Sequence, residues 1–451
     1  MNLRKNQNSF IESLATLKVS AEKISIIETT REFREKLLDL IASAKKRIYI
    51  TALYLQDDES GQEVLKAIYE AKQANPELDV KIFVDFLRAQ RGLMGYPESI
   101  GNVRLYREYA ARYEHPIDIL GVPVKTREVL GVLHLKGFVF DDTLLYSGAS
   151  LNDVYLQNET RYRYDRYHVI KNQPLCDSFV RFLQSYIVNS NAVKALTEEN
   201  IPDKKQLKPS IKQLKRKLRV GDYAFQPEQD PAASDQVSIT PMIGFGGRKN
   251  ILNRTILEMV KNTESELTIY TPYFNLPRLV NRHVRRILTK GKTVNLVIGD
   301  KTANDFYIPE EKDFNKIGIV PYVYETNLRT FVKRNQKFID SGLLNVYLWR
   351  HDANSFHLKG ISCDSCYYLI TGHNLNPRAC NLDLENGILI QDPNELLKEK
   401  FQAEYHKILN HTTRVKHFNE IETINDYPEA AKKLMRSVKR AKLDSILNRL
   451  L

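Results

Sequence analysis

The stretch GVLHLKGFVFDDTLLYSGASLNDVY, residues 131–155, recurs later in the chain as NSFHLKGISCDSCYYLITGHNLNPR, residues 354–378. The two copies align when His134 is set against His357, which lies 223 residues further on (357 − 134). An internal repeat indicates that a chain contains two copies of one structural unit. We therefore expect two related lobes, each carrying one copy of this stretch.

The landmarks around the repeated stretch recur in the same order. Upstream, RIYITALYL at residues 47–55 matches ELTIYTPYF at residues 266–274. Downstream, DRYHVI at residues 165–170 matches ENGILI at residues 385–390, with a carboxylate opening an apolar strand in both. The repeat therefore reaches well beyond the histidine stretch itself.

Each half also alternates helical and buried-strand signals, for example VKIFVDF at residues 80–86 and VNLVIGD at residues 294–300. Such alternation predicts an α/β sheet in each half. A segment that is first Lys-rich and then rich in Pro, Asp and Gln interrupts the pattern, and we interpret it as the connection between the lobes. The expected organisation is an N-terminal lobe at residues 1–201, a basic linker at 202–235, a C-terminal lobe at 236–410 and a basic helical tail at 411–451.

Composition narrows the class of protein. The chain has 451 residues, of which 42% are hydrophobic and 27% are charged, as in folded proteins with more than one domain. No apolar run approaches the roughly 18 residues that span a bilayer, and the first residues lack the apolar core of a secretory signal, so we predict a cytosolic protein. A net charge of +12 predicts an anionic partner, either nucleic acid or acidic lipid headgroups.

Both copies of the stretch contain the pattern His-x-Lys-x4-Asp. One occurrence is a weak indication, because a lone His-Lys pair on a strand more often faces solvent. Two occurrences inside matching flanks are a strong indication of a functional site. The candidate catalytic residues are His134, Lys136 and Asp141 in the first copy and His357, Lys359 and Asp364 in the second.

These residue types suit chemistry at phosphorus. On a strand, residues i and i+2 face the same way, so each His and its Lys are expected to enter one pocket. An unprotonated imidazole can attack phosphorus while lysine ammonium groups neutralise the developing charge, and the other histidine can protonate the leaving oxygen and then deprotonate the acceptor. We expect Asp165 and Glu385 to accept from an imidazole N–H and fix its tautomer. Asp141 and Asp364 are expected to brace the structure rather than to react.

In these features the sequence resembles the phospholipase D superfamily, and within it the bacterial phosphatidylserine synthases of the phospholipase D type. Besides the two motifs, the resemblance is carried by YSGASLNDVY, RYRYDRYH, TPYFNLP, GDKTANDFYIPE, ITGHNLNPRA and LDLENGILI. It implies two phospholipase D-like lobes, each a mixed β-sheet flanked by helices, related by pseudo-twofold symmetry. The implied reaction moves the phosphatidyl group of CDP-diacylglycerol to a histidine with release of CMP, and then to L-serine. No metal ion or cofactor is implied.

The resemblance also bears on finer assignments. Relatives that use the N-terminal copy favour His134 as the nucleophile, which makes His357 the acid and base. The loops after the motifs, GASLND at residues 148–153 and GHNLNP at residues 372–377, depart from the superfamily's usual Gly-Ser-x-Asn. The side chains of these loops that we predict to bind phosphate or support the site are Ser150, Asn152, Asn374 and Asn376.

A chain without a membrane span needs another way to reach a lipid substrate. Two basic segments, residues 204–219 and 432–449, are predicted to attach to an anionic membrane surface, which places the protein peripherally on the inner, cytoplasmic membrane. The apolar positions of the second segment fit a kinked helix or two helices better than one straight helix. Both segments could equally bind RNA, so ribosome association is the alternative.

Two other functions remain compatible with the motifs. One is another phospholipase D-type enzyme, such as a cardiolipin synthase or a phosphodiesterase, although cardiolipin synthases usually carry N-terminal membrane helices that this sequence lacks. The other is a basic nucleic-acid-binding module or nuclease, although the sequence contains no recognised nucleic-acid motif or aromatic stacking platform. The three functions predict different released products.

Overall fold

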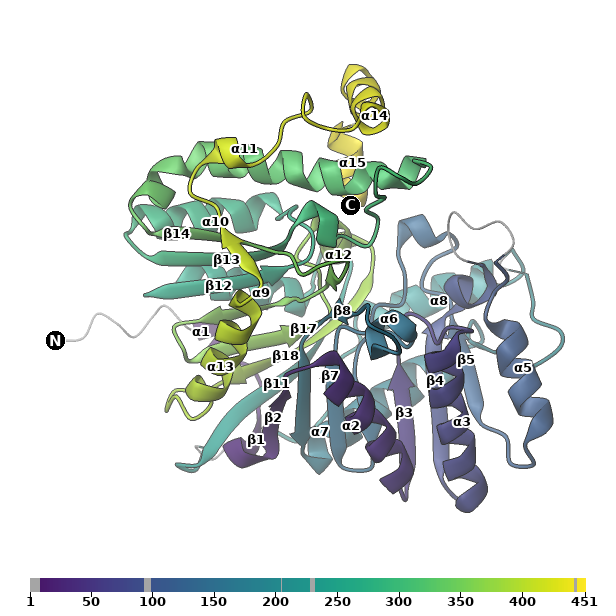
Figure 1. Ribbon diagram of the computed structural model, residues 1–451. Coiled ribbons are helices and arrows are strands. Elements are labelled where there is room, and N and C mark those ends of the chain that lie inside the picture. The colour runs from purple at the N-terminus through teal and green to yellow at the C-terminus, as the bar shows by residue number, and fades with distance from the viewer. Residues whose placement is uncertain (1–8, 93–98, 204, 228–231, 442–443) are drawn as a thin grey trace. The chain divides into compact units, whose positions relative to one another are not determined.

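The computed structural model describes residues 9–92, 99–203, 205–227, 232–441 and 444–451. The chain divides into two compact units (Figure 1). The first unit consists of Ala15–Leu252 together with Asn381–Leu389, and the second unit consists of Met1–Leu14, Asn253–Cys380 and Ile390–Leu451. A short piece of the second repeat therefore belongs to the unit that is built from the first repeat.

The first unit is built on a mixed sheet. β3, β4 and β5 run parallel to one another, whereas β6, β7, β9, β2 and β10 are antiparallel to their neighbours. The order across the sheet is β10 (Lys194–Ala195), β5 (Asp118–Val122), β4 (Asp79–Asp85), β3 (Arg47–Thr51), β6 (Phe138–Phe140), β7 (Thr143–Ser147), β9 (Tyr167–Lys171) and β2 (Ile24–Ile27). In the same unit β1 (Leu17–Ser20) pairs antiparallel with β11 (Gln236–Phe245).

The second unit repeats this order. Its strands β12, β13 and β14 are parallel neighbours, and β16, β17 and β19 are antiparallel to their partners. The order is β17 (Tyr367–Thr371), β16 (Gly360–Cys363), β12 (Glu266–Thr271), β13 (Thr293–Gly299), β14 (Leu344–Trp349) and β19 (Thr412–Arg414). The remaining strands are β8 (Arg163–Tyr164), β15 (Ser355–Phe356) and β18 (Leu384–Gln391). The predicted α/β class, with one mixed sheet per lobe, is confirmed.

Helices cover both faces of the first unit's sheet. Successive residues of a strand point to opposite faces, so the contacts of two neighbouring residues show which helix lies on which face. Phe138 in β6 packs on Phe33 of α2, with ring centroids 6.5 Å apart. A Cβ atom on the preceding Gly137 would instead lie 2.9 Å from the ring of Phe179 in α7, so α2 and α7 lie on opposite faces (Figure 1). The helices of this unit are α2 (Thr30–Ser43), α3 (Glu59–Ala74), α4 (Phe86–Gln90), α5 (Val103–Arg112), α6 (Asp153–Leu156), α7 (Gln173–Phe182) and α8 (Lys208–Leu218).

The helices of the second unit follow a comparable plan. Tyr368 of β17 stacks on Phe401 of α13, with ring centroids 3.8 Å apart, and α10 and α11 connect the parallel strands (Figure 1). The helices that lie wholly or mainly in this unit are α1 (Ser9–Glu12), α9 (Ile251–Asn262), α10 (Arg278–Thr289), α11 (Val320–Asp340), α12 (Pro377–Asn381), α13 (Lys398–Leu409), α14 (Glu429–Arg440) and α15 (Asp444–Leu450). No helix in the described part of the chain is long and apolar enough to cross a membrane.

The segment predicted as the basic linker between the lobes, residues 202–235, is grouped with the first unit. It contains α8, whose apolar edge of Ile211, Leu214 and Leu218 is only 1–2% exposed. Burial of this edge holds the helix on the unit and leaves its basic residues outside. Lys204 and residues 228–231 of this segment lie outside the described residues.

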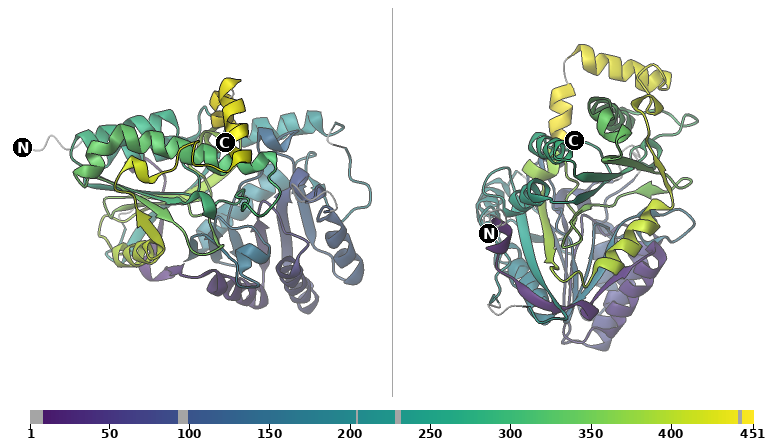
Figure 2. Two further views of the ribbon diagram at one scale, coloured as in Figure 1. Left: turned by 45° about the horizontal axis from the view of Figure 1, so that its top comes forward. Right: turned by 90° about the vertical axis from the view of Figure 1, so that its left-hand side faces the viewer.

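The predicted basic tail forms two helices, α14 and α15, which confirms the expectation of two helices or a kink. Figure 2 shows α14 lying over α11. Met435 of α14 is buried in a cluster with Tyr322 of α11, and Leu434 and Val438 pack against the same cluster. The apolar stripe of α14 is therefore part of the protein's own core, and residues 442–443 lie outside the described residues.

Candidate active site

The first motif lies in an extended segment just before β6. The sequence predicted the His-Lys pair on a strand, but the regular strand begins only at Phe138, and the segment ahead of it is joined to its neighbour by one bridge, from Leu133 to Leu384. His134 is 7% exposed and Lys136 is 1% exposed. Both side chains are thus held inside the first unit, as the alternation of an extended chain allows.

The backbone around His134 is fixed by two buried carboxylates and one backbone pair. The N–H of Val132 donates to Asp383 Oδ1 at 3.0 Å, and the N–H of Leu133 donates to Asp85 Oδ2 at 2.9 Å. The N–H of His134 donates to the carbonyl oxygen of Leu384 at 2.9 Å. Three successive residues are therefore held, which leaves the imidazole little freedom to change position.

The imidazole itself is held by Glu385. Both carboxylate oxygens lie 2.9 Å from Nδ1 of His134, and the Glu385 side chain is fully buried. A carboxylate can only accept, so this contact places a proton on Nδ1 and leaves the lone pair on Nε2. The arrangement resembles the base and its orienting carboxylate in other nucleophilic enzymes.

Lys136 is clamped through its backbone by Asn386. The N–H of Lys136 donates to Asn386 Oδ1 at 2.8 Å, and Asn386 Nδ2 donates back to the Lys136 carbonyl at 2.8 Å, as a neighbouring strand would. Asn386 also donates to the hydroxyl of Tyr223 and accepts from that of Tyr146. The Lys136 ammonium donates to the carbonyl of Ala149, in the loop that follows β7, at 3.3 Å.

A glycine follows the lysine in both motifs. Gly137 has φ +114 and Gly360 has φ +145, in the region that side chains with a Cβ atom rarely adopt. The carbonyl of Gly137 accepts from both the N–H and the hydroxyl of Thr51 at the end of β3. This turn of the backbone lets the His-Lys segment leave the sheet while the strand after it continues in regular pairing.

The second motif lies between β15 and β16 in the second unit. His357 is 7% exposed and Lys359 is 1% exposed. Nζ of Lys359 lies 3.0 Å from Nε2 of His357. Tyr273 meets the imidazole edge-on at 6.2 Å between ring centroids, and Tyr273 stacks in turn on Tyr324 of α11 at 5.3 Å. A buried ammonium group and the ring of Tyr273 therefore both lie against the second histidine.

Asp141 and Asp364 make equivalent contacts in the two units, away from the imidazoles. Asp141 accepts from the backbone N–H groups of Lys45, Lys46 and Arg47, at the start of β3. Asp364 accepts from those of Glu264, Ser265 and Glu266, at the start of β12. Each carboxylate ties one turn to the beginning of another strand, which agrees with a bracing function.

The loop residues divide into two kinds. Asn152 Oδ1 accepts from the N–H of Tyr155, and Asn376 Oδ1 accepts from the N–H of Ala379, so both asparagines cap the short helix that follows their strand. Asn374 Oδ1, in contrast, is buried without a hydrogen-bond partner within the described part of the chain, and Ser150 is buried at 2% exposure.

The predicted site residue Asp165 and a further histidine, His373 in the loop after β17, each make a contact that shapes the backbone. Asp165 is buried in the first unit, where its Oδ1 accepts from the N–H of Arg166. His373 is fully buried in the second unit and accepts the N–H of Leu375 at Nδ1, which shapes the loop after β17. Neither contact reveals a reaction step, and both show how these loops are held.

Sequence reasoning missed three residues that hold the first motif, Asp85, Asp383 and Asn386. Asn386 follows Glu385 directly in ENGILI. The match of this segment to DRYHVI was the signal in the sequence that could have drawn attention to Asn386. Asp85 ends a buried strand, where a carboxylate at the carboxyl edge of a parallel sheet often faces a site. Burial raises the pKa of Asp85 to about 6, because the charged form loses water that its three backbone hydrogen bonds only partly replace.

A cationic side chain also lies beside this segment. A Cβ atom on Gly131 would lie 3.1 Å from Cγ of Lys125, and Nζ of Lys125 is 5.1 Å from the ring centroid of Phe245. Burial, followed by the charges of Lys215 and Arg219, lowers the pKa of Lys125 to about 8. The first unit thus keeps positive charge close to its motif.

Comparison with known proteins agrees with this geometry. The family model described as "Cardiolipin synthase, PLD-like domain" matches residues 37–187 and 256–412, one match in each half. The CDP-diacylglycerol–serine O-phosphatidyltransferase PssA of Escherichia coli (strain K12) is 45% identical over 451 residues and covers 99% of both chains. The CDP-diacylglycerol–serine O-phosphatidyltransferase of Haemophilus influenzae is 44% identical over 455 residues and covers 100% of both chains.

A solved structure extends the comparison to the fold. The crystal structure of phosphatidylserine synthase from Haemophilus influenzae matches with a TM-score of 0.95 and 42% identity, over 100% of both chains. A CDP-diacylglycerol–glycerol-3-phosphate 3-phosphatidyltransferase from Saccharomyces pastorianus is more distant, with 26% identity over 87% of this chain and 83% of its own. The chain therefore belongs to the phospholipase D superfamily, and within it to the phosphatidylserine synthases of the phospholipase D type.

Proposed function

We propose that the chain is a CDP-diacylglycerol–serine O-phosphatidyltransferase, which moves a phosphatidyl group to L-serine and releases CMP. Two relatives that match over their full length at 44% and 45% identity carry this name. The observation that supports the mechanism most directly is the buried contact between Glu385 and Nδ1 of His134, at 2.9 Å. It prepares Nε2 of one imidazole to attack phosphorus.

In the first step, Nε2 of His134 attacks the phosphorus of the phosphatidyl group. A P–N bond forms and the P–O bond to the CMP phosphate breaks, with His357 as the acid that protonates the leaving oxygen. Glu385 stabilises the positive charge that develops on the His134 ring. The products of this half-reaction are CMP and a phosphatidyl-histidine.

In the second step, the serine hydroxyl replaces the histidine. His357, now without its proton, accepts the hydroxyl proton while the serine oxygen attacks phosphorus, and the P–N bond to His134 breaks. Phosphatidylserine leaves and both imidazoles return to their starting protonation states. We assign the nucleophile to His134 by analogy with relatives that use the N-terminal copy, and the carboxylate of Glu385 on its Nδ1 supports this assignment.

The remaining site residues support the phosphate and the rings. Lys136 and Lys359 neutralise nonbridging oxygens as charge builds, which buried ammonium groups do effectively. Ser150 and Asn374 are the loop side chains we assign to phosphate contacts, since Asn152 and Asn376 are occupied as helix caps. Asp165 occupies in the first repeat the position of Glu385 in the second, and we assign it the same task of orienting an imidazole.

Attachment to an anionic membrane is the route we propose to the lipid substrate, and it places the protein at the inner, cytoplasmic membrane. The apolar edges of α8 and α14 pack inside their own units, so attachment through the segments 204–219 and 432–449 is electrostatic. Each basic residue near such a surface contributes about 1 kcal/mol. The fraction of protein that sediments with anionic vesicles should fall steeply between low and high salt. Release of the protein from these vesicles by added RNA would favour the ribosome alternative.

The deciding experiment follows CMP release from CDP-diacylglycerol in detergent, with and without L-serine. Wild type should release CMP with serine, and His134→Ala and His357→Ala should each lower the rate by about 10³-fold or more. His406→Ala, an exposed histidine on α13, is the matched control and should behave as wild type. Loss of activity in only one of the two motif variants would contradict a reaction that draws on both.

The same assay separates the alternatives. Glycerol 3-phosphate in place of serine tests the activity named for the Saccharomyces pastorianus relative, and phosphatidylglycerol tests cardiolipin formation. Release of CMP with water alone at the full rate would indicate a phosphodiesterase. Absence of CMP under every condition from a folded protein, together with cleavage of DNA or RNA, would overturn the lipid assignment in favour of a nuclease.

A further inference from the structure

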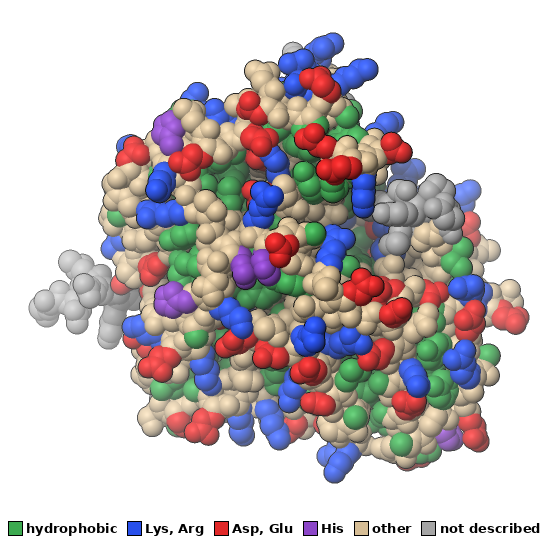
Figure 3. Space-filling view, viewed as in Figure 1, with side chains coloured by type: hydrophobic (Ala, Val, Ile, Leu, Met, Phe, Trp, Pro, Cys, Tyr) green, Lys and Arg blue, Asp and Glu red, His purple; other side chains and the backbone are tan. Residues whose placement is uncertain are grey.

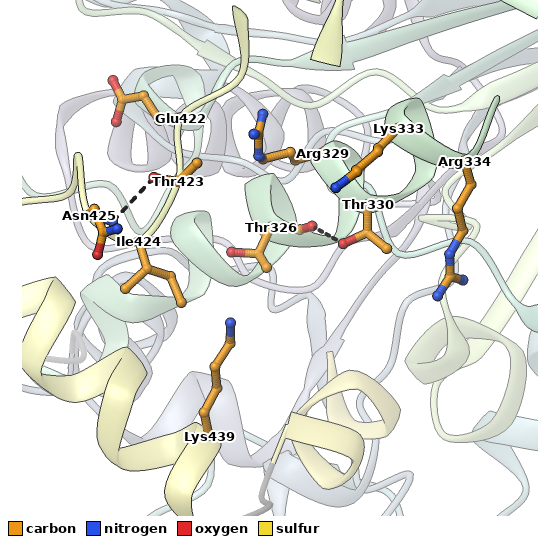
Figure 4. A pocket seen from close by; sticks show the side chains of 10 residues that line it. All are labelled: Thr326, Arg329, Thr330, Lys333, Arg334, Glu422, Thr423, Ile424, Asn425 and Lys439. Carbon is orange, nitrogen blue, oxygen red and sulfur yellow. Dashed lines mark hydrogen bonds between the residues drawn. The ribbon is translucent and has the colours of Figure 1, made fainter. Parts of the chain in front are cut away.

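A pocket of about 640 Å³ opens in the second unit, between α11, the loop at residues 422–425 and α14 (Figure 4). None of its lining residues belongs to either histidine motif. Pockets that hold small ligands usually measure about 300 to 1,000 Å³, so this one is large enough for an organic ligand. The transfer reaction at the histidine motifs therefore does not account for a ligand in this pocket.

Its lining is strongly cationic. Arg329, Lys333 and Arg334 come from α11, and Lys439 comes from α14 on the opposite side (Figure 4). Within the described residues, no carboxylate lies within ion-pair distance of Lys333, Arg334 or Lys439. Arg329 and Lys333, four residues apart on one helix, repel each other, so the cluster costs stability in the absence of an anion.

The acidic groups around the pocket are already engaged. Glu422, the one acidic residue in its lining, is ion-paired with Lys301, which also pairs with Glu325 at 3.2 Å. Asp426, next to the lining loop, accepts from both the N–H and the hydroxyl of Thr423 at 2.8 and 2.7 Å. Glu422 is therefore engaged by Lys301, whereas Asp426 also attracts Arg329.

Arg329 in the wall of the pocket is held in place by its neighbours. The guanidinium of Arg329 donates to the carbonyl oxygens of Phe418 and Ile421, the latter at 3.0 Å, and lies 5.1 Å from the ring centroid of Phe418. These contacts tie α11 to the segment that leads into the loop at 422–425. A guanidinium that is already held loses little conformational entropy when a ligand binds.

We propose that this pocket binds a phosphate-bearing anion, at a site separate from the histidine motifs. Arginine offers paired donors that match phosphate oxygens, and the lysines add point charges from two sides. Figure 3 shows further Lys and Arg side chains gathered at the top of the view, over α14, where they would draw anions toward the pocket. The phosphate can come from a soluble organic phosphate or from the headgroup of an anionic phospholipid.

The test compares two triple variants of the full chain that lose the same charge. The pocket variant carries Lys333→Gln, Arg334→Gln and Lys439→Gln. The control variant carries Arg285→Gln, Arg286→Gln and Lys290→Gln, at exposed positions on α10 and just after it. All six residues are exposed, so both proteins should fold, and equal melting temperatures verify this.

Binding is measured with glycerol 3-phosphate by calorimetry and with phosphatidylcholine vesicles, with or without phosphatidylglycerol, by flotation. The pocket variant should bind at least about tenfold more weakly while the control stays within about twofold of wild type. Such a loss with glycerol 3-phosphate identifies a soluble ligand, and a loss only with phosphatidylglycerol vesicles identifies a lipid headgroup. Equal weakening of both variants, or of neither, would overturn the proposal and attribute any binding to net charge or to another site.

Discussion

The carboxylate of Glu385 lies 2.9 Å from Nδ1 of His134, although the two residues are 251 positions apart in the chain. Replacing Glu385 by Gln keeps the size of the side chain but removes the charge that stabilises an imidazolium. We expect kcat for CMP release to fall by about 10²- to 10⁴-fold with little change in KM for CDP-diacylglycerol. Glu399→Gln, at an exposed site on α13, is the matched control. A rate within threefold of wild type would show that the contact is structural only.

The carboxylates of Asp141 and Asp364 should matter for stability rather than for chemistry. Each accepts three backbone N–H groups at a strand start, so Asp141→Ala should lower the free energy of unfolding by about 2 to 3 kcal/mol. Asp141→Asn should lose less, because asparagine keeps one acceptor and tolerates the positive φ of +51. Denaturant unfolding measures both variants. A large fall in kcat at unchanged stability would instead make Asp141 a reacting group.

Gly137→Ala should disturb both the fold and Lys136. The added Cβ atom would meet Phe179 at 2.9 Å and Leu144 at 3.2 Å, at a φ of +114 that alanine rarely adopts. We expect a loss of about 1 to 3 kcal/mol in stability together with a lower kcat. Gly291→Ala, at φ +75 with nothing within 4 Å, isolates the backbone cost and should leave kcat unchanged. If both substitutions lowered stability and kcat equally, contact of the new Cβ atom with Phe179 and Leu144 could not be the cause.

Lys125 should make stability depend on pH in the alkaline range. Its pKa is lowered to about 8 in the folded protein, from an ordinary value of 10.5, so between these values the unfolded chain binds a proton that the folded chain does not. Stability attributable to this group therefore rises with pH from about 8 to 10. Lys125→Met should raise the melting temperature at pH 7 and remove that rise, whereas Lys212→Met, exposed on α8, should do neither. The difference between melting curves of variant and wild type at each pH is the measurement.

The repeat was enough to predict the two α/β units, because duplicated strand and helix signals in one order admit few topologies. The strand order around β3 and β12 is the same, with three parallel strands on one side and an antiparallel run on the other. The position of residues 381–389 could not be predicted in this way. Periodicity shows that ENGILI is a strand, but it does not show which of two similar sheets receives it.

The apolar stripe of α14 illustrates the same limit. Leu434 and Val438 are spaced as on an amphipathic helix, and the sequence pattern is identical whether a membrane or a protein core covers that face. The structure places them on the cluster around Tyr322. Similarly, Asp85 and Asp383 act on backbone N–H groups of residues far away in sequence, and such contacts leave no local signature. Sequence motifs therefore identify candidate reacting residues more readily than the residues that position them.

Because residues 381–389 belong to the first unit, that unit cannot be completed early during synthesis of the chain on the ribosome. After Leu252 has been made, 137 further residues (389 − 252) must be added before that unit has its full set of strands. At about 5 to 20 residues per second on a ribosome, this takes roughly 7 to 27 s. During that interval Asp383, Glu385 and Asn386 do not yet exist, so the segment that carries His134 lacks the hydrogen bonds that will hold it. Newly made chains should therefore need chaperone protection longest over the segment that carries His134.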